Sequence, residues 1–535
     1  MNNTIWILGD QLTLQHPALA APDPAGDVVL MIESRERGAH CKYHRIKLVM
    51  IYAAMRHFAA GLRERGWTVD YHRLADTEDF ETAWKRHRKN FPGRKLLMME
   101  PNSWMETVQA QKIAEEYSLD LETLPSCQFL VPRTEFQNQS SGRKRLLMEN
   151  HYRPLRQKRN ILMAEGGQPE GGVWNFDSEN RKTVADWKKA KPSPPPLSPL
   201  ATPQKDPLVK EVAAEVDRWF PEAFGSSAGT WVPVTRSEAL ALLGDFVRHR
   251  LSHYGDYQDL MLEGSPGMFH SLISASLNIG LLDPMECVDA AVDAWKTGKA
   301  PLGAVEGFVR QIIGWREFIN GVYWLKMPGY AESNGLSATR PLPEFFYTGM
   351  TEMKCLRTVL REAHDSAYNH HIQRLMILGN FLLLAGIRPR EAYRWFLEMY
   401  VDAFDWVMAA NVLGMALHAD GGFMATKPYA GSGAYISRMS NYCQGCAYDP
   451  KKKSGAGACP FNLLYWDFFD RHMERFSSNP RVGMIINTWR KRPEAEKNVI
   501  RAEAAAFLDN LAAGQSRGKE KTDPSKKPVA LKEDG

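Results

Sequence analysis

Three cysteines near the C-terminal end of this 535-residue chain have the spacing of a thiolate metal site. Cys443 and Cys446 enclose two residues, and Cys459 follows after a loop rich in lysine and glycine. Proline directly after Cys459 fits iron–sulfur ligation, in which the last cysteine of a run precedes proline. A closed site needs a fourth thiolate, and Cys355, at the start of an amphipathic segment, is the best placed.

Zinc is the alternative metal for these thiols. A four-cysteine zinc ribbon usually has two C-x2-C pairs, and this chain has one. The spacing therefore favours a [4Fe–4S] cluster over zinc. Of the remaining cysteines, Cys287 lies in an apolar stretch and is expected to pack in a core, while Cys41 and Cys127 belong to the first part of the chain.

In three other stretches, polar residues interrupt apolar segments that have the spacing of helices. Residues 304–324 hold Gln311, Arg316 and Glu317 among aromatic side chains, an array that suits a flavin or a nucleobase; a buried structural ion pair is the alternative. Residues 393–420 combine aromatic side chains with acidic ones. Aromatic residues at helical spacing in this stretch indicate a packed core. They indicate an electron relay only if a redox cofactor lies beside them.

The third stretch, residues 367–380, places two adjacent histidines, His370 and His371, before Arg374 and Asn380. Adjacent helical residues cannot both face inward, so we expect one histidine to contact a pocket. Histidine can give or take a proton near neutral pH. Arginine and asparagine nearby suit a charged planar ligand, whereas a satisfied core histidine is the alternative.

The first 125 residues contain the elements of an α/β domain. Short apolar runs at residues 5–8, 28–32, 67–71, 96–99 and 121–124 predict strands, and residues 44–65 have the apolar spacing of one helix face. Their alternation predicts a parallel sheet with helices on both faces. No G-x-G-x-x-G follows the first run, so a Rossmann dinucleotide site is not supported. Ligands bind beyond the carboxyl ends of such strands, which indicates Gly9, Asp10, Gln11 and Glu33 as a pocket rim.

The remainder predicts a large all-α domain. Thr235 and Glu238 form a capping signal, and helical periodicity continues to about residue 511. We therefore expect an α/β domain at 1–130, a basic and proline-rich connector at 131–234, an all-α domain at 235–511 and a disordered tail at 512–535. Basic residues interleaved with aromatic ones at 132–159 suit nucleic-acid phosphates, a solvated helix face being the alternative: Arg143, Lys144, Arg145, Arg153, Arg156, Lys158 and Arg159.

Bulk composition is that of a globular protein. Hydrophobic residues make up 44% and charged residues 24%, and the net charge of +5 is small, so any nucleic-acid surface is a local patch. Signal-peptide and membrane-spanning patterns are missing from the sequence. Seven cysteines favour metal binding over disulfides. We expect a cytoplasmic monomer.

Several motifs together resemble the prokaryotic iron–sulfur cryptochromes and (6-4) photolyases, a branch of the photolyase–cryptochrome family. The resemblance runs from residue 5 to about residue 489. Its carriers are residues 8–12 (LGDQL), 54–59 (AMRHFA), 174–177 (WNFD), 304–318, 370–376 and 426–429 (TKPY), with the four cysteines.

The resemblance implies three cofactors. The [4Fe–4S] cluster is implied on the four cysteines. FAD is implied in the helical domain, near Ser271, Leu272, Ser274, Gln311, Arg316, Arg374, Asn380, Asp402, Asp405 and Asn411, where a helix start would hold the pyrophosphate. A 6,7-dimethyl-8-ribityllumazine antenna is implied near Gly9, Asp10, Ile32, Glu33 and Ile51.

The implied activity is light-driven repair of (6-4) photoproducts in UV-damaged DNA, with the lesion flipped out of the duplex. His371 falls at the family's lesion-facing histidine, beside His370, and the electron-relay positions are Tyr347, Trp395 and Phe396. The chain departs from some members at Met408, where they carry Glu, and at Arg37 and His40 in the antenna pocket. Two alternatives stay open, a blue-light sensor that performs no repair and a non-photochemical nucleic-acid-binding protein without flavin.

Overall fold

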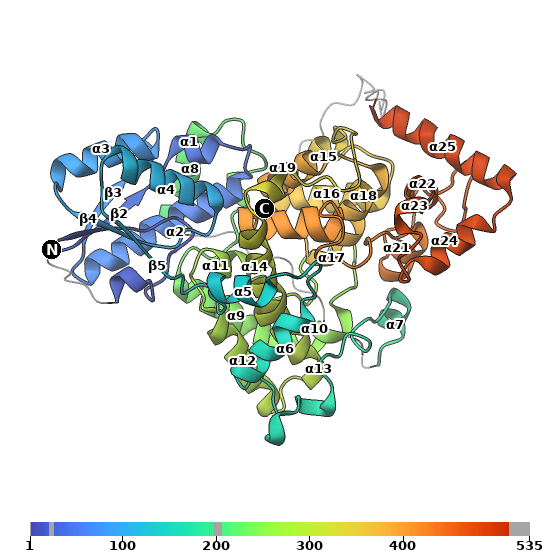
Figure 1. Cartoon of the computed structure of the whole chain (residues 1–535), viewed down its shortest axis with the longest axis horizontal. Coiled ribbons are helices and arrows are strands. Elements are labelled where there is room, and N and C mark those ends of the chain that lie inside the picture. The colour runs from blue at the N-terminus through green and yellow to red at the C-terminus, as the bar shows by residue number, and fades with distance from the viewer. Residues whose placement is uncertain (1, 21–25, 192, 194, 196–205, 513–535) are drawn as a thin grey trace, which may run out of the picture.

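A computed structural model describes residues 2–20, 26–191, 193, 195 and 206–512. The part that contains the sheet lies at one end of the long axis, and the C-terminal helices lie at the other (Figure 1). Most of the expected proline-rich segment, and all of the expected tail except residue 512, lie outside the described residues.

The predicted parallel sheet is present. Its strands are β1 (Asn3–Trp6), β2 (Val28–Ile32), β3 (Thr68–His72), β4 (Lys95–Met99) and β5 (Leu121–Leu124), in the order β3-β2-β1-β4-β5. All four ladders are parallel, and Ile5 of β1 pairs with Val29 on one side and Leu97 on the other. The chain order reverses between β1 and β4, so their carboxyl ends form the crevice in which such sheets bind ligands.

Helices cover both faces of the sheet because successive side chains of a strand alternate between them. Trp6, Leu30 and Leu96 pack with side chains of α3 (Phe80–Asn90) and α4 (Trp104–Glu116). Ile5 and Val29 belong instead to the large cluster that contains the apolar face of α2 (Arg45–Glu64). Helices α1 (Arg35–Ala39) and α8 (Pro207–Trp219) complete this part, with α8 packed against α2.

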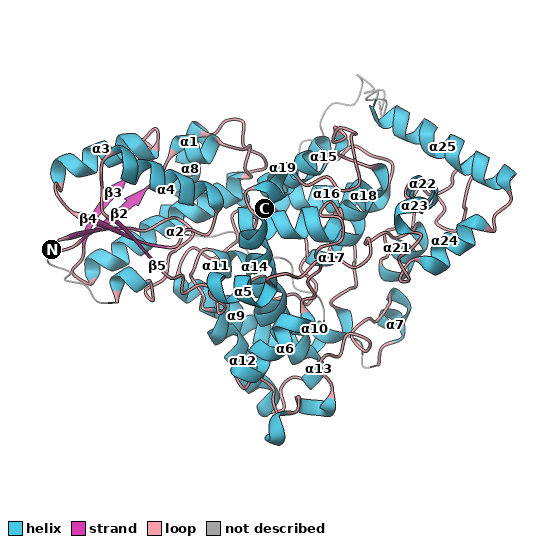
Figure 2. Ribbon diagram, in the orientation of Figure 1, coloured by secondary structure: helices cyan, strands magenta, loops and turns pink. Residues whose placement is uncertain are grey.

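In the rest of the described chain, the regular secondary structure is helical, with loops between the helices (Figure 2). The predicted capping box is confirmed: Thr235 and Glu238 exchange hydrogen bonds of 3.1 and 3.3 Å at the start of α9. Among the residues that the structure describes, no helix is both long and apolar enough to cross a membrane. The helices are α5 (Arg133–Ser140), α6 (Glu149–Lys158), α7 (Val184–Lys189), α9 (Arg236–His249), α10 (Leu251–Tyr257), α11 (Ser274–Asn278), α12 (Pro284–Lys296), α13 (Leu302–Val309), α14 (Glu317–Lys326), α15 (Phe345–Thr348), α16 (Lys354–Ser366), α17 (His371–Gln373), α18 (Asn380–Ala385), α19 (Pro389–Met399), α20 (Asp405–Met408), α21 (Gly433–Met439), α22 (Pro460–Arg471), α23 (Met473–Phe476), α24 (Gly483–Arg490) and α25 (Glu494–Ala512).

Three π-helical segments interrupt this helical part, at Arg310–Arg316, Arg374–Gly379 and Ala409–Ala416. Each lies within one of the three polar stretches that stand out in the sequence. Because a π turn carries one extra residue, it redirects the side chains around it, and such turns are frequent at functional sites.

Candidate functional site

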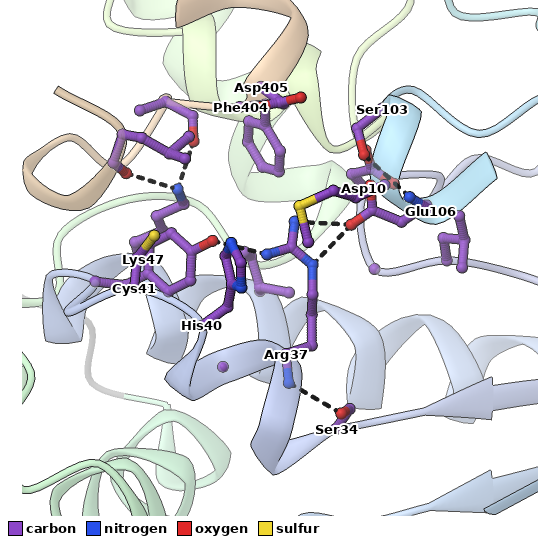
Figure 3. Close-up of a pocket in the computed structure, with 18 of the residues that line it drawn as sticks. Asp10, Ser34, Arg37, His40, Cys41, Lys47, Ser103, Glu106, Phe404 and Asp405 are labelled. Carbon is purple, nitrogen blue, oxygen red and sulfur yellow. Dashed lines mark hydrogen bonds and ion pairs between the residues drawn. The ribbon is translucent and has the colours of Figure 1, made fainter. Parts of the chain in front are cut away.

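A cavity of about 440 Å³ lies where the carboxyl ends of the strands meet the helical part. Gly9, Asp10, Ile32 and Ile51 line it, together with Arg37 and His40. Figure 3 shows Arg37 reaching from α1 toward Glu106 of α4, with Phe404 and Asp405 on the opposite wall. Residues of the helical part therefore close the crevice at the carboxyl ends of β1 and β4.

An ion pair and the buried titratable groups of Asp10 and Lys47 line this cavity. Arg37 donates to Glu106 at 2.7 Å and to the hydroxyl of Tyr43 at 2.7 Å. Burial raises the pKa of Asp10 to about 7, an effect that the charge of Glu106 reinforces. Burial lowers the pKa of Lys47 to about 7, and its ammonium donates to the carbonyls of residues 397 and 403. A ligand here meets groups that titrate near neutrality, so ring nitrogens and carbonyls suit it better than a full charge.

Glu33 was expected at the rim of this pocket, but it does not line the cavity. Its fully buried carboxylate forms a bidentate pair with Arg56 of α2, at 2.7 and 2.9 Å. It also accepts hydrogen bonds from the Tyr71 hydroxyl at 2.5 Å and the Leu74 amide at 2.9 Å. The Glu33 side chain points toward α2 and not into the cavity, because the guanidinium of Arg56 on that helix neutralises its charge.

A second polar centre surrounds the two histidines. His370 is 1% exposed and stacks on His270 at 4.6 Å, while the next side chain, His371, is accessible. Burial of the surroundings nevertheless lowers the pKa of His371 to about 4. One of the two adjacent histidines is thus buried and the other accessible, and the expectation that one of them contacts a pocket stays a prediction.

Several residues expected to bind FAD come together beside these histidines. Arg374 forms a bidentate pair with Asp402 at 2.8 and 3.2 Å, and the hydroxyl of Ser274 donates to Asp402 at 2.7 Å. The guanidinium also lies 3.9 Å from the ring of Tyr400. Leu272 has a φ of 63°, which turns the chain sharply just before α11, and Ser271 adjoins it.

Other residues expected at that site are engaged elsewhere. Arg316 donates to the carbonyl of residue 128 at 2.7 Å and pairs with Glu317 at 3.3 Å, while Glu317 accepts from the amides of residues 130 and 131. This is the structural ion pair that the sequence left open, and it anchors the connector to α14. Asp405 accepts from the hydroxyls of Tyr323 and Tyr393 and lines the interdomain cavity. The amides of Gln311, Asn380 and Asn411 bond to main-chain carbonyls of residues 307, 431 and 407.

The aromatic stretch continues from this centre toward the surface. Tyr400 lies 5.9 Å from Trp395 and 5.7 Å from Phe396. The indole of Trp395 is fully buried and donates to the carbonyl of Phe346 at 3.1 Å. Tyr347, the next residue, is 38% exposed. The three expected relay positions thus span the distance from a buried ring to solvent.

The four expected thiols line one small pocket, with Cys355 contributed by α16 and Cys459 by the residue before α22. Burial raises the pKa of the Cys355 thiol, and the charges of the other three add to this shift. No three ligating side chains among the described residues lie close enough to share a single metal ion. Cys287 is fully buried on α12.

The basic stretch divides into two kinds of residue. Arg156 is fully buried and donates to the carbonyls of residues 161, 162 and 174, so it holds the chain that follows α6. The other six are exposed, and two of them pair with nearby carboxylates: Arg153 with Glu149, and Lys158 with Glu135. Only the exposed residues are placed to meet phosphates.

Several residues of these sites carried no signal in the sequence. Lys47, Tyr43 and Glu106 line the interdomain cavity, the first from the start of α2, the second from just before that helix and the third from α4. A lysine on the apolar face of helix 44–65 is the one local cue, since a buried charge requires partners. Glu106, in the first turn of α4, looks like an ordinary helix-start carboxylate.

The chain has relatives among photolyases. Residues 5–231 match the family model of deoxyribodipyrimidine photo-lyase-related proteins. A (6-4) photolyase of Agrobacterium fabrum is 43% identical over 96% of this chain and all of its own length. A class III photolyase of Agrobacterium tumefaciens has the same fold, with a TM-score of 0.56 and 16% identity over 95% of this chain and 97% of its own. A Synechocystis cryptochrome follows, with a TM-score of 0.54 and 13% identity over 79% and 83%.

At 43% identity over 514 residues, the match to the Agrobacterium fabrum protein covers almost the whole chain. This chain therefore belongs to the photolyase–cryptochrome family, on the branch that includes a bacterial (6-4) photolyase.

Proposed function

We propose that this chain is a light-driven enzyme that repairs (6-4) photoproducts in DNA. The observation that carries the proposal is the accessible His371 beside the Arg374–Asp402–Ser274 set, in a chain 43% identical to a (6-4) photolyase over nearly its full length. A proton donor or acceptor next to a site for a charged planar group is what such a reaction needs.

FAD fits the polar centre around the histidines. Ser271 and Ser274 offer hydroxyls at the sharp turn before α11, and Arg374 with Asp402 offers a guanidinium and a carboxylate held in fixed geometry. We propose that these four residues bind it, and that Gln311 and Asn411 from π-helical segments and Asn380 from the start of α18 support them. Bound FAD supplies the light absorption and the electron that bond cleavage in the lesion requires.

His371 is the residue proposed to donate a proton to the lesion. With its pKa lowered to about 4 in the ligand-free protein, the imidazole is neutral at pH 7. Phosphates of bound DNA bring negative charge close to the ring, which raises the pKa and favours the imidazolium. His371 can then donate to the lesion, while the neighbouring His370 is held by its own stacking on His270.

The exposed basic residues of the connector grip the DNA backbone in this proposal. Arg143, Lys144 and Arg145 follow one another between α5 and α6, and the amide of Leu146 bonds to the carbonyl of Phe423, so the loop is tied to the helical part. Arg153, Lys158 and Arg159 extend the same basic surface along α6. Such contacts position the duplex while the flipped base enters the protein.

We propose that the interdomain cavity holds the antenna, a ribityllumazine. A bicyclic ring with several nitrogens and carbonyls matches the neutral or paired polar groups of Asp10, Arg37 and Lys47, and Ile32 and Ile51 supply apolar contact. The four-cysteine pocket is proposed to hold a [4Fe–4S] cluster that ties α16 to α22.

The deciding experiment illuminates reduced, flavin-loaded protein with defined (6-4) and cyclobutane substrates and measures restored thymines. We expect repair of the (6-4) substrate, and a loss of at least about 100-fold in His371→Ala, the range of general acid–base catalysis. His249→Ala, an exposed histidine at the end of α9, is the matched control. Restoration by His371→Ala at the wild-type rate would refute its role. Absence of any restoration by wild-type protein would favour the light-sensor alternative.

A further inference from the structure

A single buried amide, that of Gln373, joins the four-cysteine pocket to the turn that carries His371. Its oxygen accepts from the amide of His370 at 3.0 Å. Its nitrogen donates to the carboxylate of Glu362 at 2.6 Å and to the hydroxyl of Tyr442 at 2.9 Å. Gln373 is fully buried, so both N–H groups and the oxygen have partners and the amide has one orientation.

Each residue that accepts from the Gln373 amide nitrogen lies in the same segment of chain as one of the cysteines. Glu362 lies on α16, two helical turns after Cys355, on the same side of that helix. Tyr442 is fully buried, directly precedes Cys443 and lines the cysteine pocket. A shift of either cysteine therefore moves a group that holds Gln373.

The opposite side of the same network holds the residues next to His371. The amide of Asn369 donates to the Glu362 carboxylate at 3.5 Å. Arg374 donates to the carbonyl of Asn369 at 2.8 Å, and Tyr400 donates to its side-chain oxygen at 2.7 Å. Glu362 thus contacts residues on both sides of the two histidines. Since α17 contains three residues, its position depends on these contacts.

We propose that Gln373 is a positioning residue through which the state of the four-cysteine site sets the position of His371. This inference rests on the proposed function of His371 in repair. When the cysteines hold their metal, Tyr442 and Glu362 are fixed and Gln373 holds the histidine turn. When the metal is lost, the turn loosens while the rest of the helical part stays folded, so the cysteine site controls repair without entering the chemistry.

Tyr442→Phe is the most direct test, because it removes one hydroxyl and leaves one N–H of Gln373 without its partner. Tyr448→Phe is the matched control. Tyr448 lines the same pocket, but its hydroxyl donates to the exposed carboxylate of Glu352 at 3.1 Å. Purified, cofactor-loaded proteins are compared for iron per chain, for amide hydrogen exchange of residues 369–375, and for kcat and KM on lesion DNA.

We expect exchange of residues 369–375 to rise about 2- to 10-fold in Tyr442→Phe, the range that one hydrogen bond supports. Repair kcat falls while KM and iron content stay at wild-type values, and Tyr448→Phe changes none of these. Unchanged exchange in Tyr442→Phe, or equal effects of the two variants, would overturn the inference.

A double-mutant cycle tests the connection to the metal. Cys446→Ser is expected to raise the same exchange in the wild-type background, and to add less to it in Tyr442→Phe, because both changes release the same contact. Strictly additive effects would overturn the coupling. Exchange is measured whether or not lesions are repaired, so failure of the proposed function is seen separately, as wild-type protein that restores no thymines.

Discussion

Replacing Glu33 by glutamine should destabilise the α/β part strongly, although Glu33 lies outside the cavity. The carboxylate is fully buried and Arg56 is 4% exposed. Glutamine keeps the size of the side chain, but it puts an N–H₂ group where one carboxylate oxygen accepts from Arg56 and from Leu74 or Tyr71. Donors would then face donors in a buried space.

The loss of stability in Glu33→Gln depends on which carboxylates still pair with Arg56. Breaking a buried ion pair by removing one partner costs about 3–5 kcal/mol. Arg56 keeps a second carboxylate, that of Glu215, at 2.6 Å, which offsets part of the uncompensated charge. We therefore expect the lower end, about 3 kcal/mol, which corresponds to a fall in Tm of about 6–12 °C for a unit of 150–250 residues.

Thermal unfolding combined with hydrogen exchange of the strand amides measures this change in the part that contains it. The control is Glu211→Gln. Glu211 also pairs with Arg56, at 3.3 Å, but it is 48% exposed, so its removal should change stability by no more than about 1 kcal/mol. If the two variants lose the same stability, burial is not what makes the Glu33 pair strong, and the reasoning fails.

Three further predictions concern the other sites. Because burial raises the pKa of Asp10 to about 7, the folded chain keeps a proton that the unfolded chain releases, and stability falls as pH rises from about 4 to 7; Asp10→Asn should therefore raise Tm at pH 8 more than at pH 5. Arg145→Ala should weaken DNA binding and reduce the salt slope by about one, whereas Arg156→Ala should lower Tm with the slope unchanged, as titrations at several salt concentrations would show. Cys446→Ser should lose bound iron in a colorimetric assay and Cys287→Ser should retain it; iron-free wild-type protein would contradict the cluster.

The sheet could be predicted because its signals are local. Strands β2 and β5 begin and end at the predicted residues: β2 is an apolar run buried along its whole length, whereas the partly exposed β5 is marked by its two terminal leucines. The capping box at Thr235 is likewise read within four residues. The π-helical segments could not be predicted, because one extra residue in a helical turn leaves the apolar spacing almost unchanged.

Asp402 and Asp405 show where local spacing stops being informative. Both were expected at one FAD site, as the family resemblance implied, and they lie only three positions apart in the sequence. In the structure the chain between α19 and α20 is not helical, and the two carboxylates diverge: Asp402 pairs with Arg374, while Asp405 accepts from Tyr323 and Tyr393 at the interdomain cavity. The connection between α19 and α20 and the first residue of α20 thus supply one carboxylate to each of the two proposed chromophore sites. A change in the conformation of this connection would therefore move a residue at each of the two sites. The sequence around either aspartate gives no sign of this link.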